Sequence, residues 1–262
     1  MIDRMRASRP TGILTDIDGT ISPIAQSPEL AEVDPRARAA LARLTREFDL
    51  IAAVSGRSAE DAHRMVGLDS LVYSGNHGME WWRNGKLEQS KLASEHAPRI
   101  RELLHRLERA ISVDGVRFED KTLTASVHVR ETRNPEQAEI EIVELATELA
   151  DELNLRVTRG RMVVEIRPPI ELNKGSSVRD LVEAYGLASG IYIGDDVTDV
   201  DAFQVMKGLR ERNRAHLYAI GVNSLETPAI VIEEADALVE GIPGVVDLLE
   251  YAAGLHGDRS GD

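Results

Sequence analysis

The chain of 262 residues contains no cysteine. Disulfide bonds, thiolate metal ligands and a cysteine nucleophile are therefore excluded. Long hydrophobic runs are missing as well. The opening residues, "MIDRMRASRP", contain no apolar segment like that of a secretory signal, and no later run approaches the length of a membrane span. These absences predict a cytoplasmic protein with no membrane partner.

An excess of basic residues is also missing. Lysine and arginine number 31 against 45 aspartates and glutamates, which gives a formal net charge of −14. This balance argues against a nucleic-acid-binding surface, since such surfaces rely on an excess of basic side chains. With 42% hydrophobic and 29% charged residues, the composition is otherwise that of an ordinary globular protein. Any anionic ligand must therefore be bound by a local positive charge.

Short apolar runs alternate with helical segments near both ends of the chain. The runs "GILTDID" and "DLIAAVSG" flank "DPRARAALARLTREFD", whose apolar residues recur at helical spacing, with Asp34 as the N-cap and Pro35 as the first helical residue. Later in the chain, the strands "IYIGDD" and "LYAIGV" alternate with the helices "SSVRDLVEAYG" and "VDAFQVMKG". This alternation predicts an α/β fold with a doubly wound parallel sheet.

The middle of the chain follows a different order, which reads helix, two strands, helix, two strands. The helical segments "HAPRIRELLHRLERAI" and "EIEIVELATELADEL" each carry one apolar stripe, and the strands alternate between apolar and polar residues. We expect an inserted α+β domain, with a four-stranded antiparallel sheet and two helices on one face. The core domain would then be residues 1–91 and 169–262, and the inserted domain residues 92–168.

Two carboxylates follow the first apolar strand, in "LTDIDGT". Asp16 and Asp18 are two residues apart, so on an extended chain their side chains point to the same face, and Gly19 then allows a sharp turn. The carboxyl ends of parallel strands are where open α/β sheets bind ligands. Two aspartates alone would be explained better by a turn with local hydrogen bonds. A second acidic group favours a shared site.

That second group follows another apolar strand, in "IGDDVTD", and consists of Asp195, Asp196 and Asp199. If it converges with the first pair at one sheet edge, five negative charges repel one another unless a cation binds them. Oxygen ligands select a hard ion, and Mg²⁺ is the usual one where phosphate is handled. The alternative is that Asp199, and also Asp196, caps the next helix. The sequence therefore predicts a magnesium site.

Two further segments suit a phosphate group. "VSGRS" ends a strand with Ser55 and Gly56, which offer a hydroxyl and an unhindered backbone N–H to an anion. "NKGSS" places Lys174 just before a helix, where a lysine is unfavourable unless it faces a bound anion. Each signal is weak alone. Together with the acidic groups, each at a strand end, they predict a phosphate-binding site.

In chain order, "DIDGT", "SGR", a lysine before a helix and "GDDVTD" resemble the four motifs of the haloacid dehalogenase-like (HAD) phosphatases. The resemblance implies that Asp16 is a nucleophile that forms an aspartyl-phosphate, and that Asp18 is the general acid and base. The implied Mg²⁺ ligands are Asp16, the backbone carbonyl of Asp18 and Asp195, with Asp196 or Asp199 in support. The implied phosphate ligands are Ser55, Gly56 and Lys174.

Longer segments narrow the resemblance. "YSGNHGMEW", "EDKTLTASVHVR", "VVEIRP…NKG" and "GDDVTDVDAF" are together similar to the trehalose-6-phosphate phosphatase family, in which a cap domain is inserted between the second and third motifs. Val200 stands where that family has glutamate. The alternatives are phosphatases of sucrose-phosphate or of glucosyl- or mannosyl-phosphoglycerate, a phosphomutase, and a non-catalytic sugar-phosphate-binding domain. We expect a monomer that releases trehalose and phosphate.

Alternation in the inserted strands places six polar residues on the face opposite the apolar one. They are Glu119, Lys121, His128, Arg130, Glu165 and Arg167. A mixture of donors and acceptors suits a neutral sugar, and the alternative is a solvated face with cross-strand ion pairs. The family resemblance favours Glu119, Lys121 and Glu165 as sugar contacts, with His128 and Arg130 as further candidates.

Three more candidates follow strands of the core domain. Asn76 and His77, in "SGNHG", are expected to contact the substrate, although His77 has the alternative role of bracing its loop. Arg57 either reaches the phosphate or pairs with Asp18, and we favour the pairing.

Overall fold

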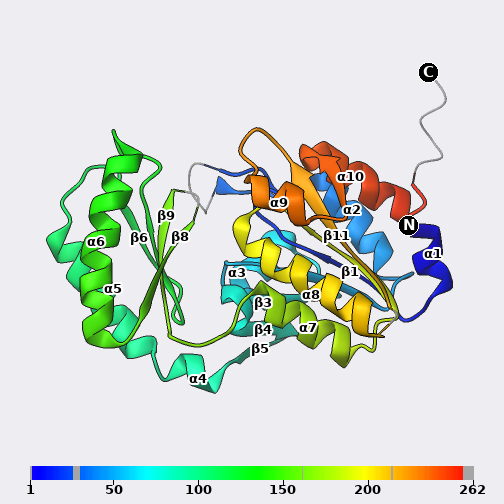
Figure 1. The fold of residues 1–262 in the computed structure, drawn as a ribbon, viewed down its shortest axis with the longest axis horizontal. Coiled ribbons are helices and arrows are strands. Elements are labelled where there is room, and N and C mark those ends of the chain that lie inside the picture. The colour runs from blue at the N-terminus through cyan, green and yellow to red at the C-terminus, as the bar shows by residue number, and fades with distance from the viewer. Residues whose placement is uncertain (1, 26–29, 161, 214, 256–262) are drawn as a thin grey trace. The chain divides into compact units, whose positions relative to one another are not determined.

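A computed structural model of the chain describes residues 2–25, 30–160, 162–213 and 215–255 (Figure 1). The chain folds into two compact units. The first unit combines residues 1–88 with residues 172–262, and the second unit is the intervening segment 89–171. The second unit therefore extends three residues beyond each end of the segment 92–168 expected from the sequence.

The first unit is built on an eight-stranded sheet with the order β12-β11-β10-β1-β2-β3-β4-β5. Its strands are β1 (Thr11–Thr15), β2 (Leu50–Val54), β3 (Val72–Gly75), β4 (Glu80–Arg83), β5 (Lys86–Gln89), β10 (Ser189–Gly194), β11 (His216–Asn223) and β12 (Ala237–Glu240). The pairings from β12 to β3 are parallel, and β4 is antiparallel to β3. The predicted parallel sheet is thus extended at one edge by β4 and β5.

Helices cover both faces of this sheet (Figure 1). One face packs against α1 (Ile2–Ala7), α2 (Pro35–Leu44), α3 (Ala59–Val66) and α10 (Gly241–Ala252). The other packs against α7 (Lys174–Ala184), α8 (Val197–Asn213) and α9 (Ala229–Glu234). Because both faces are covered, β1 and β2 are buried along their whole length, as expected for central parallel strands. Asp34 caps α2 as predicted, accepting from the backbone N–H of Arg36 and Ala37.

The second unit is a four-stranded antiparallel sheet with two long helices on one side of it (Figure 1). In the order β6-β7-β9-β8, its strands are β6 (Arg117–Asp120), β7 (Ala125–His128), β9 (Val163–Arg167) and β8 (Arg156–Gly160). The helices are α4 (Lys91–Ser94), α5 (Ala97–Ala110) and α6 (Pro135–Leu153). The apolar stripes of α5 and α6 pack on the inward side chains of β7 and β9. This confirms the predicted α+β architecture.

The helices of the described residues differ from membrane-spanning helices. None of their helices combines the length and the apolar character that a transmembrane span requires.

A partly exposed ion pair links α8 to the sheet of the first unit. Arg210 donates to the Asp236 carboxylate from Nη1 at 2.7 Å and from Nη2 at 2.8 Å. The backbone N–H of Ala219, on β11, donates to the same carboxylate at 2.8 Å. Burial by itself raises the pKa of Asp236, but the hydrogen bonds from Arg210 and Ala219 outweigh it and lower the pKa below its usual value. The folded state therefore stabilises the ionised form.

We expect Asp236→Asn to lower the free energy of unfolding at pH 7 by about 1–3 kcal/mol, because hydrogen bonds to a charged acceptor are lost. Since folding depresses this pKa, the stabilisation is present above the unfolded-state pKa and is lost as the pH falls through the folded-state value. Denaturant unfolding at pH 7 and in acid measures both effects. The difference between parent and variant should shrink in acid, and a difference that grows there contradicts the assignment.

Candidate active site

Two neighbouring strands of the sheet, β1 and β10, are each followed directly by an aspartate. Thr15 of β1 lies opposite Ile193 of β10, and the backbone N–H of Asp16 donates to the Ile193 carbonyl at 2.8 Å. Asp16 is the first residue after β1, and Asp195 is the first after β10. Both are buried, with 4% and 3% of their surface exposed. Parallel pairing therefore brings the two acidic motifs to one edge of the sheet, as the sequence predicts.

The loop after β1 is shaped around the Asp195 carboxylate. Gly19 has a left-handed φ of 84°, and a Cβ at this position would lie 2.2 Å from Asp195 Oδ2. The next residue, Thr20, donates from Oγ1 to Asp195 Oδ1 at 3.1 Å. Glycine is required here both for its backbone conformation and for the space beside the carboxylate. The loop fixes Asp195 from one side.

Three of the five predicted acidic residues form a cluster. Asp16, Asp195 and Asp199 each offer a carboxylate oxygen, and these oxygens lie within 4.8 Å of one another. All three residues are buried, and the donors are all oxygen, which fits a hard divalent cation. Asp196 is half-buried and outside this group, and its backbone N–H donates to Asp199 Oδ2 at 3.0 Å. The cluster can therefore hold a metal ion.

A buried lysine lies against two members of the cluster. Lys174 Nζ is 2.9 Å from Asp16 Oδ1 and 2.8 Å from Asp199 Oδ1. Lys174 was predicted to precede the helix, but it is the first residue of α7. The reason is that Asn173 is the N-cap: its side chain accepts from the N–H of Ser176, whose hydroxyl accepts from the N–H of Asn173. This capping box directs the lysine towards the cluster.

Burial and charge have opposing effects on these groups. Burial has the largest effect on Asp16 and raises its pKa. The charge of Lys174 lowers this pKa, whereas the charges of Asp199 and Asp195 raise it. The net result is a pKa well above the usual value. Burial lowers the pKa of Lys174, but Asp16 and Asp199 raise it beyond its usual range, and the ammonium stays protonated. One ammonium among three carboxylates leaves an excess of negative charge, which a divalent cation would offset.

The Asp18 side chain points to an arginine. Arg57 Nε lies 2.7 Å from Asp18 Oδ2, and Arg57 Nη2 lies 2.7 Å from Asp18 Oδ1. The other side of the guanidinium is anchored by Asp61, with Nη1 2.8 Å from Oδ2. The fork-like geometry of arginine allows it to bind a carboxylate through two parallel bonds. Of the two roles considered for Arg57, the structure shows the pairing with Asp18.

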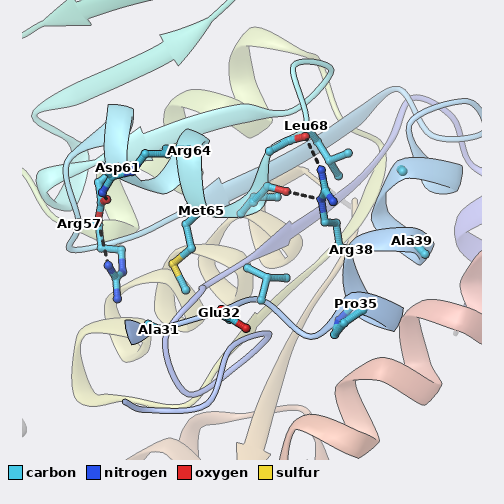
Figure 2. Close-up of a pocket in the computed structure, with 14 residues that line it drawn as sticks. Ala31, Glu32, Pro35, Arg38, Ala39, Arg57, Asp61, Arg64, Met65 and Leu68 are labelled. Carbon is cyan, nitrogen blue, oxygen red and sulfur yellow. Dashed lines mark hydrogen bonds and ion pairs between the residues drawn. The ribbon is translucent and has the colours of Figure 1, made fainter. Parts of the chain in front are cut away.

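Arg57 and Asp61 also line a cavity of about 820 Å³ between α2 and α3 (Figure 2). On the opposite wall Arg38 donates to the backbone carbonyls of Val66 and Gly67, at the end of α3 (Figure 2). The residues of the acidic cluster do not line this cavity. The chemistry of the cluster is therefore not located there.

The loop after β2 is braced by the loop after β3. The N–H of His77 donates to the Ser55 carbonyl at 3.1 Å, and the N–H of Asn76 donates to the Arg57 carbonyl at 2.7 Å. Asn76 and His77 both adopt left-handed backbone conformations, with φ of 47° and 54°, which is uncommon for residues other than glycine. A Cβ at Gly56 would lie 2.8 Å from His77 Nε2. His77 therefore has the bracing role, and its contact with a substrate stays a prediction.

In the second unit, four of the predicted polar residues meet on one face of the sheet. Glu119 lies 2.8 Å from His128 Nε2 and 3.8 Å from Lys121 Nζ, and Lys121 Nζ lies 3.7 Å from Glu165 Oε1. The register aligns Glu119 with Ser126, and Ser126 with Glu165. The cross-strand ion pairs considered as an alternative are thus present. Arg167 lies on β9, and the predicted candidate Arg130 lies just beyond the end of β7.

The sequence reasoning missed two residues of the site. Thr20 binds Asp195, and Tyr192, on β10, donates from its hydroxyl to Asp199 Oδ1 at 2.5 Å. A signal for Tyr192 was present, since a tyrosine in a fully buried strand requires a partner for its hydroxyl. Its partner, Asp199, lies on the following helix α8, so no local sequence pattern pairs the two residues.

Residues 14–228 match the Trehalose-phosphatase family. The chain is 35% identical over 222 residues to the probable trehalose-phosphate phosphatase 2 of Oryza sativa subsp. japonica, covering 74% of this chain and 58% of that one. It is 30% identical over 250 residues to the trehalose-phosphate phosphatase of Mycobacterium avium (strain 104), covering 89% and 63%. The chain thus spans about three fifths of the length of these two curated relatives.

A solved structure shares the fold. The C-terminal domain of trehalose-6-phosphate phosphatase from C. albicans superposes with a TM-score of 0.78 at 23% identity, covering 97% of this chain and 95% of that one.

We expect Gly19→Ala to displace the Asp195 carboxylate and to weaken the binding of a divalent metal ion, with Mg²⁺ as the probe, about tenfold or more, as changes to groups that orient a metal ligand do. Calorimetric titration of the metal-free protein measures this. The matched control is Gly85→Ala, because Gly85 also has a left-handed φ, of 70°, and no atom lies within 4 Å of a Cβ built there. Equal losses of metal affinity in the two variants would contradict the role assigned to Gly19.

Proposed function

The chain belongs to the trehalose-phosphatase family, and from that premise we propose that it is a magnesium-dependent phosphatase acting on trehalose 6-phosphate. One observation carries the chemical part of this proposal. The buried Asp16 carboxylate lies 2.9 Å from the Lys174 ammonium, inside a group of three carboxylates that can hold a metal ion. A buried carboxylate, a positive charge and a group of possible metal ligands thus lie together, which supports the proposed nucleophilic chemistry.

In the first step, an Asp16 oxygen attacks phosphorus, forming an aspartyl-phosphate, and the bond from phosphorus to the sugar oxygen breaks. Asp18 donates a proton to the leaving oxygen. In the second step, Asp18 takes a proton from water, whose oxygen attacks phosphorus and releases phosphate and the free Asp16 carboxylate. Arg57 binds the Asp18 carboxyl group through two hydrogen bonds and thereby orients it for both steps.

Lys174, Ser55 and Gly56 would bind the phosphoryl oxygens. Lys174 supplies a protonated ammonium, and Ser55 and Gly56 supply a hydroxyl and a backbone N–H from a loop that the segment after β3 braces. Mg²⁺ would be held by Asp16, Asp195 and the backbone carbonyl of Asp18, with Asp199 or Asp196 in support, and would supply positive charge for the transition state.

We assign sugar recognition to the polar face of the second unit, together with Asn76 and His77. Glu119, Lys121, His128 and Glu165 offer both donors and acceptors within one set of ion pairs. A neutral disaccharide presents hydroxyl groups that both donate and accept, so this mixture suits it better than a surface of one sign. Arg130 is a further candidate at the end of β7.

A panel of sugar phosphates, assayed for phosphate release with Mg²⁺, tests the proposed function. We expect the highest kcat/KM on trehalose 6-phosphate and a loss of more than about a thousandfold for Asp16→Asn, since the nucleophile is removed. A higher kcat/KM on sucrose-phosphate or on glucosyl-phosphoglycerate overturns the substrate assignment. Full activity of the Asp16→Asn variant overturns the mechanism.

Sugar recognition has a separate test. We expect Glu165→Gln to raise the KM for trehalose 6-phosphate about tenfold, because a charged acceptor that also orients Lys121 is lost. Activity on a small aryl phosphate should change little, since that substrate has no sugar to recognise. Glu152→Gln is the control: Glu152 lies on α6 and pairs with Arg106. An unchanged KM in Glu165→Gln, or an equal rise in Glu152→Gln, contradicts the assignment.

A further inference from the structure

Tyr192 is a buried tyrosine whose hydroxyl is bound to a carboxylate of the proposed active site. It lies on β10, three residues before Asp195, and none of its surface is exposed. Its neighbours Ile191 and Ile193 face α2 and α10, so Tyr192 faces α7 and α8, which carry Lys174 and Asp199. The hydroxyl donates to Asp199 Oδ1 at 2.5 Å. The strand alternation therefore directs this hydroxyl towards the site.

Asp199 receives four hydrogen bonds. Oδ1 accepts from the Tyr192 hydroxyl at 2.5 Å and from Lys174 Nζ at 2.8 Å. Oδ2 accepts from the backbone N–H groups of Asp195 at 3.1 Å and Asp196 at 3.0 Å. An ionised carboxylate has about four acceptor positions, and these donors occupy them. Within the cluster of Asp16, Asp195 and Asp199, Asp199 is therefore the member whose acceptor positions are already filled by these protein donors.

The packing around Asp199 allows it one orientation. A Cβ at Gly194 would lie 2.3 Å from Asp199 Cγ, so the carboxylate rests directly on the end of β10. The residue is fully buried, and its two oxygens are bound by different partners. Rotation of the carboxylate would break its hydrogen bonds to the backbone N–H groups of Asp195 and Asp196 and its bond to Lys174 at the same time.

The Tyr192 hydroxyl also affects how strongly the Lys174 ammonium binds Asp199 relative to Asp16. The ammonium lies between Asp199 Oδ1 and Asp16 Oδ1, at 2.8 Å and 2.9 Å. A second donor on Asp199 Oδ1 disperses the negative charge there and weakens the pull of that oxygen on the lysine. The ammonium is then held more firmly towards Asp16, where the phosphoryl group would be transferred.

We propose that Tyr192 is a positioning residue for phosphoryl transfer. Its hydroxyl fixes Asp199 as the acceptor that orients Lys174 and the loop of Asp195 and Asp196, so that Asp199 supports the metal site without binding the ion. This rests on the proposed phosphatase function, and its structural part, the coupling between Tyr192 and Asp199, is independent of any substrate.

The main test is Tyr192→Phe, which removes the hydroxyl and keeps the ring. We expect kcat on trehalose 6-phosphate to fall about tenfold with KM unchanged, since the hydroxyl acts on the transition state through Lys174. Vanadate, which mimics the phosphoryl group in that state, should bind the Mg²⁺-loaded protein about tenfold more weakly in calorimetry. Mg²⁺ alone should bind with an affinity within about twofold of the parent, because no metal ligand is removed.

Two control variants separate the hydroxyl from other effects of a buried tyrosine. Tyr73→Phe removes a hydroxyl that donates to the Leu68 carbonyl at 2.7 Å, away from the acidic cluster. Phe203→Leu removes the edge-on ring that lies 6.0 Å from the Tyr192 ring. Both should lower thermal stability while leaving kcat and vanadate affinity unchanged. If Phe203→Leu reproduces the losses of Tyr192→Phe, ring packing is responsible and the proposal is wrong.

A double-mutant cycle in unfolding tests the structural part. The Tyr192 hydroxyl donates to the Asp199 carboxyl group, so Tyr192→Phe should cost less stability when Asp199→Asn has already changed that acceptor. If Tyr192→Phe alone does not fold, the double variant should recover a cooperative unfolding transition. Additive effects in the cycle, or an unchanged kcat and vanadate affinity in Tyr192→Phe, overturn the proposal. Coupling in the cycle without phosphatase activity in the parent overturns the proposed function and leaves the positioning contact in place.

Discussion

The structure of the site depends on one buried ammonium. Lys174 has 3% of its surface exposed and lies within 3 Å of oxygens of both Asp16 and Asp199. Removing these charges from water is costly, and the cost is offset only when the partners are close and their remaining acceptor positions are filled. This requirement explains the capping box that directs Lys174 inward and the four donors around Asp199. The lysine neutralises only part of the negative charge, and a further cation would offset the excess.

Glycine makes this convergence of carboxylates possible. At Gly19 and at Gly194, a Cβ would lie 2.2 Å and 2.3 Å from the nearest atom of Asp195 or Asp199. The loop after β1 therefore packs directly against the Asp195 carboxylate at Gly19. The end of β10 packs in the same way against Asp199 at Gly194. Such close packing leaves little freedom for the side chains, which is what a site of positioned oxygens requires.

The two units carry different sets of polar groups. The parallel sheet of the first unit collects the reactive groups at the ends of its strands, where they are buried and held by backbone hydrogen bonds. The antiparallel sheet of the second unit has one apolar face under its helices, so the other face is available for polar residues. The set of Glu119, Lys121, His128 and Glu165 is only partly buried, which suits the recognition of hydroxyl groups better than covalent chemistry.

The sequence by itself determined the architecture of both units and predicted which residues are candidates for the reactive groups. Apolar runs that end at Asp16, Ser55 and Asp195 indicate parallel strands whose ends carry the candidate site. These features can be predicted because hydrophobic periodicity and the order of strands and helices depend on residues that are close in sequence. Tertiary structure decided the finer roles: Asp199 rather than Asp196 joins the cluster, Arg57 binds Asp18, and Tyr192 completes Asp199. These roles depend on side-chain directions and on donors from separate strands and helices, and no local pattern specifies which of several aspartates a distant donor will reach.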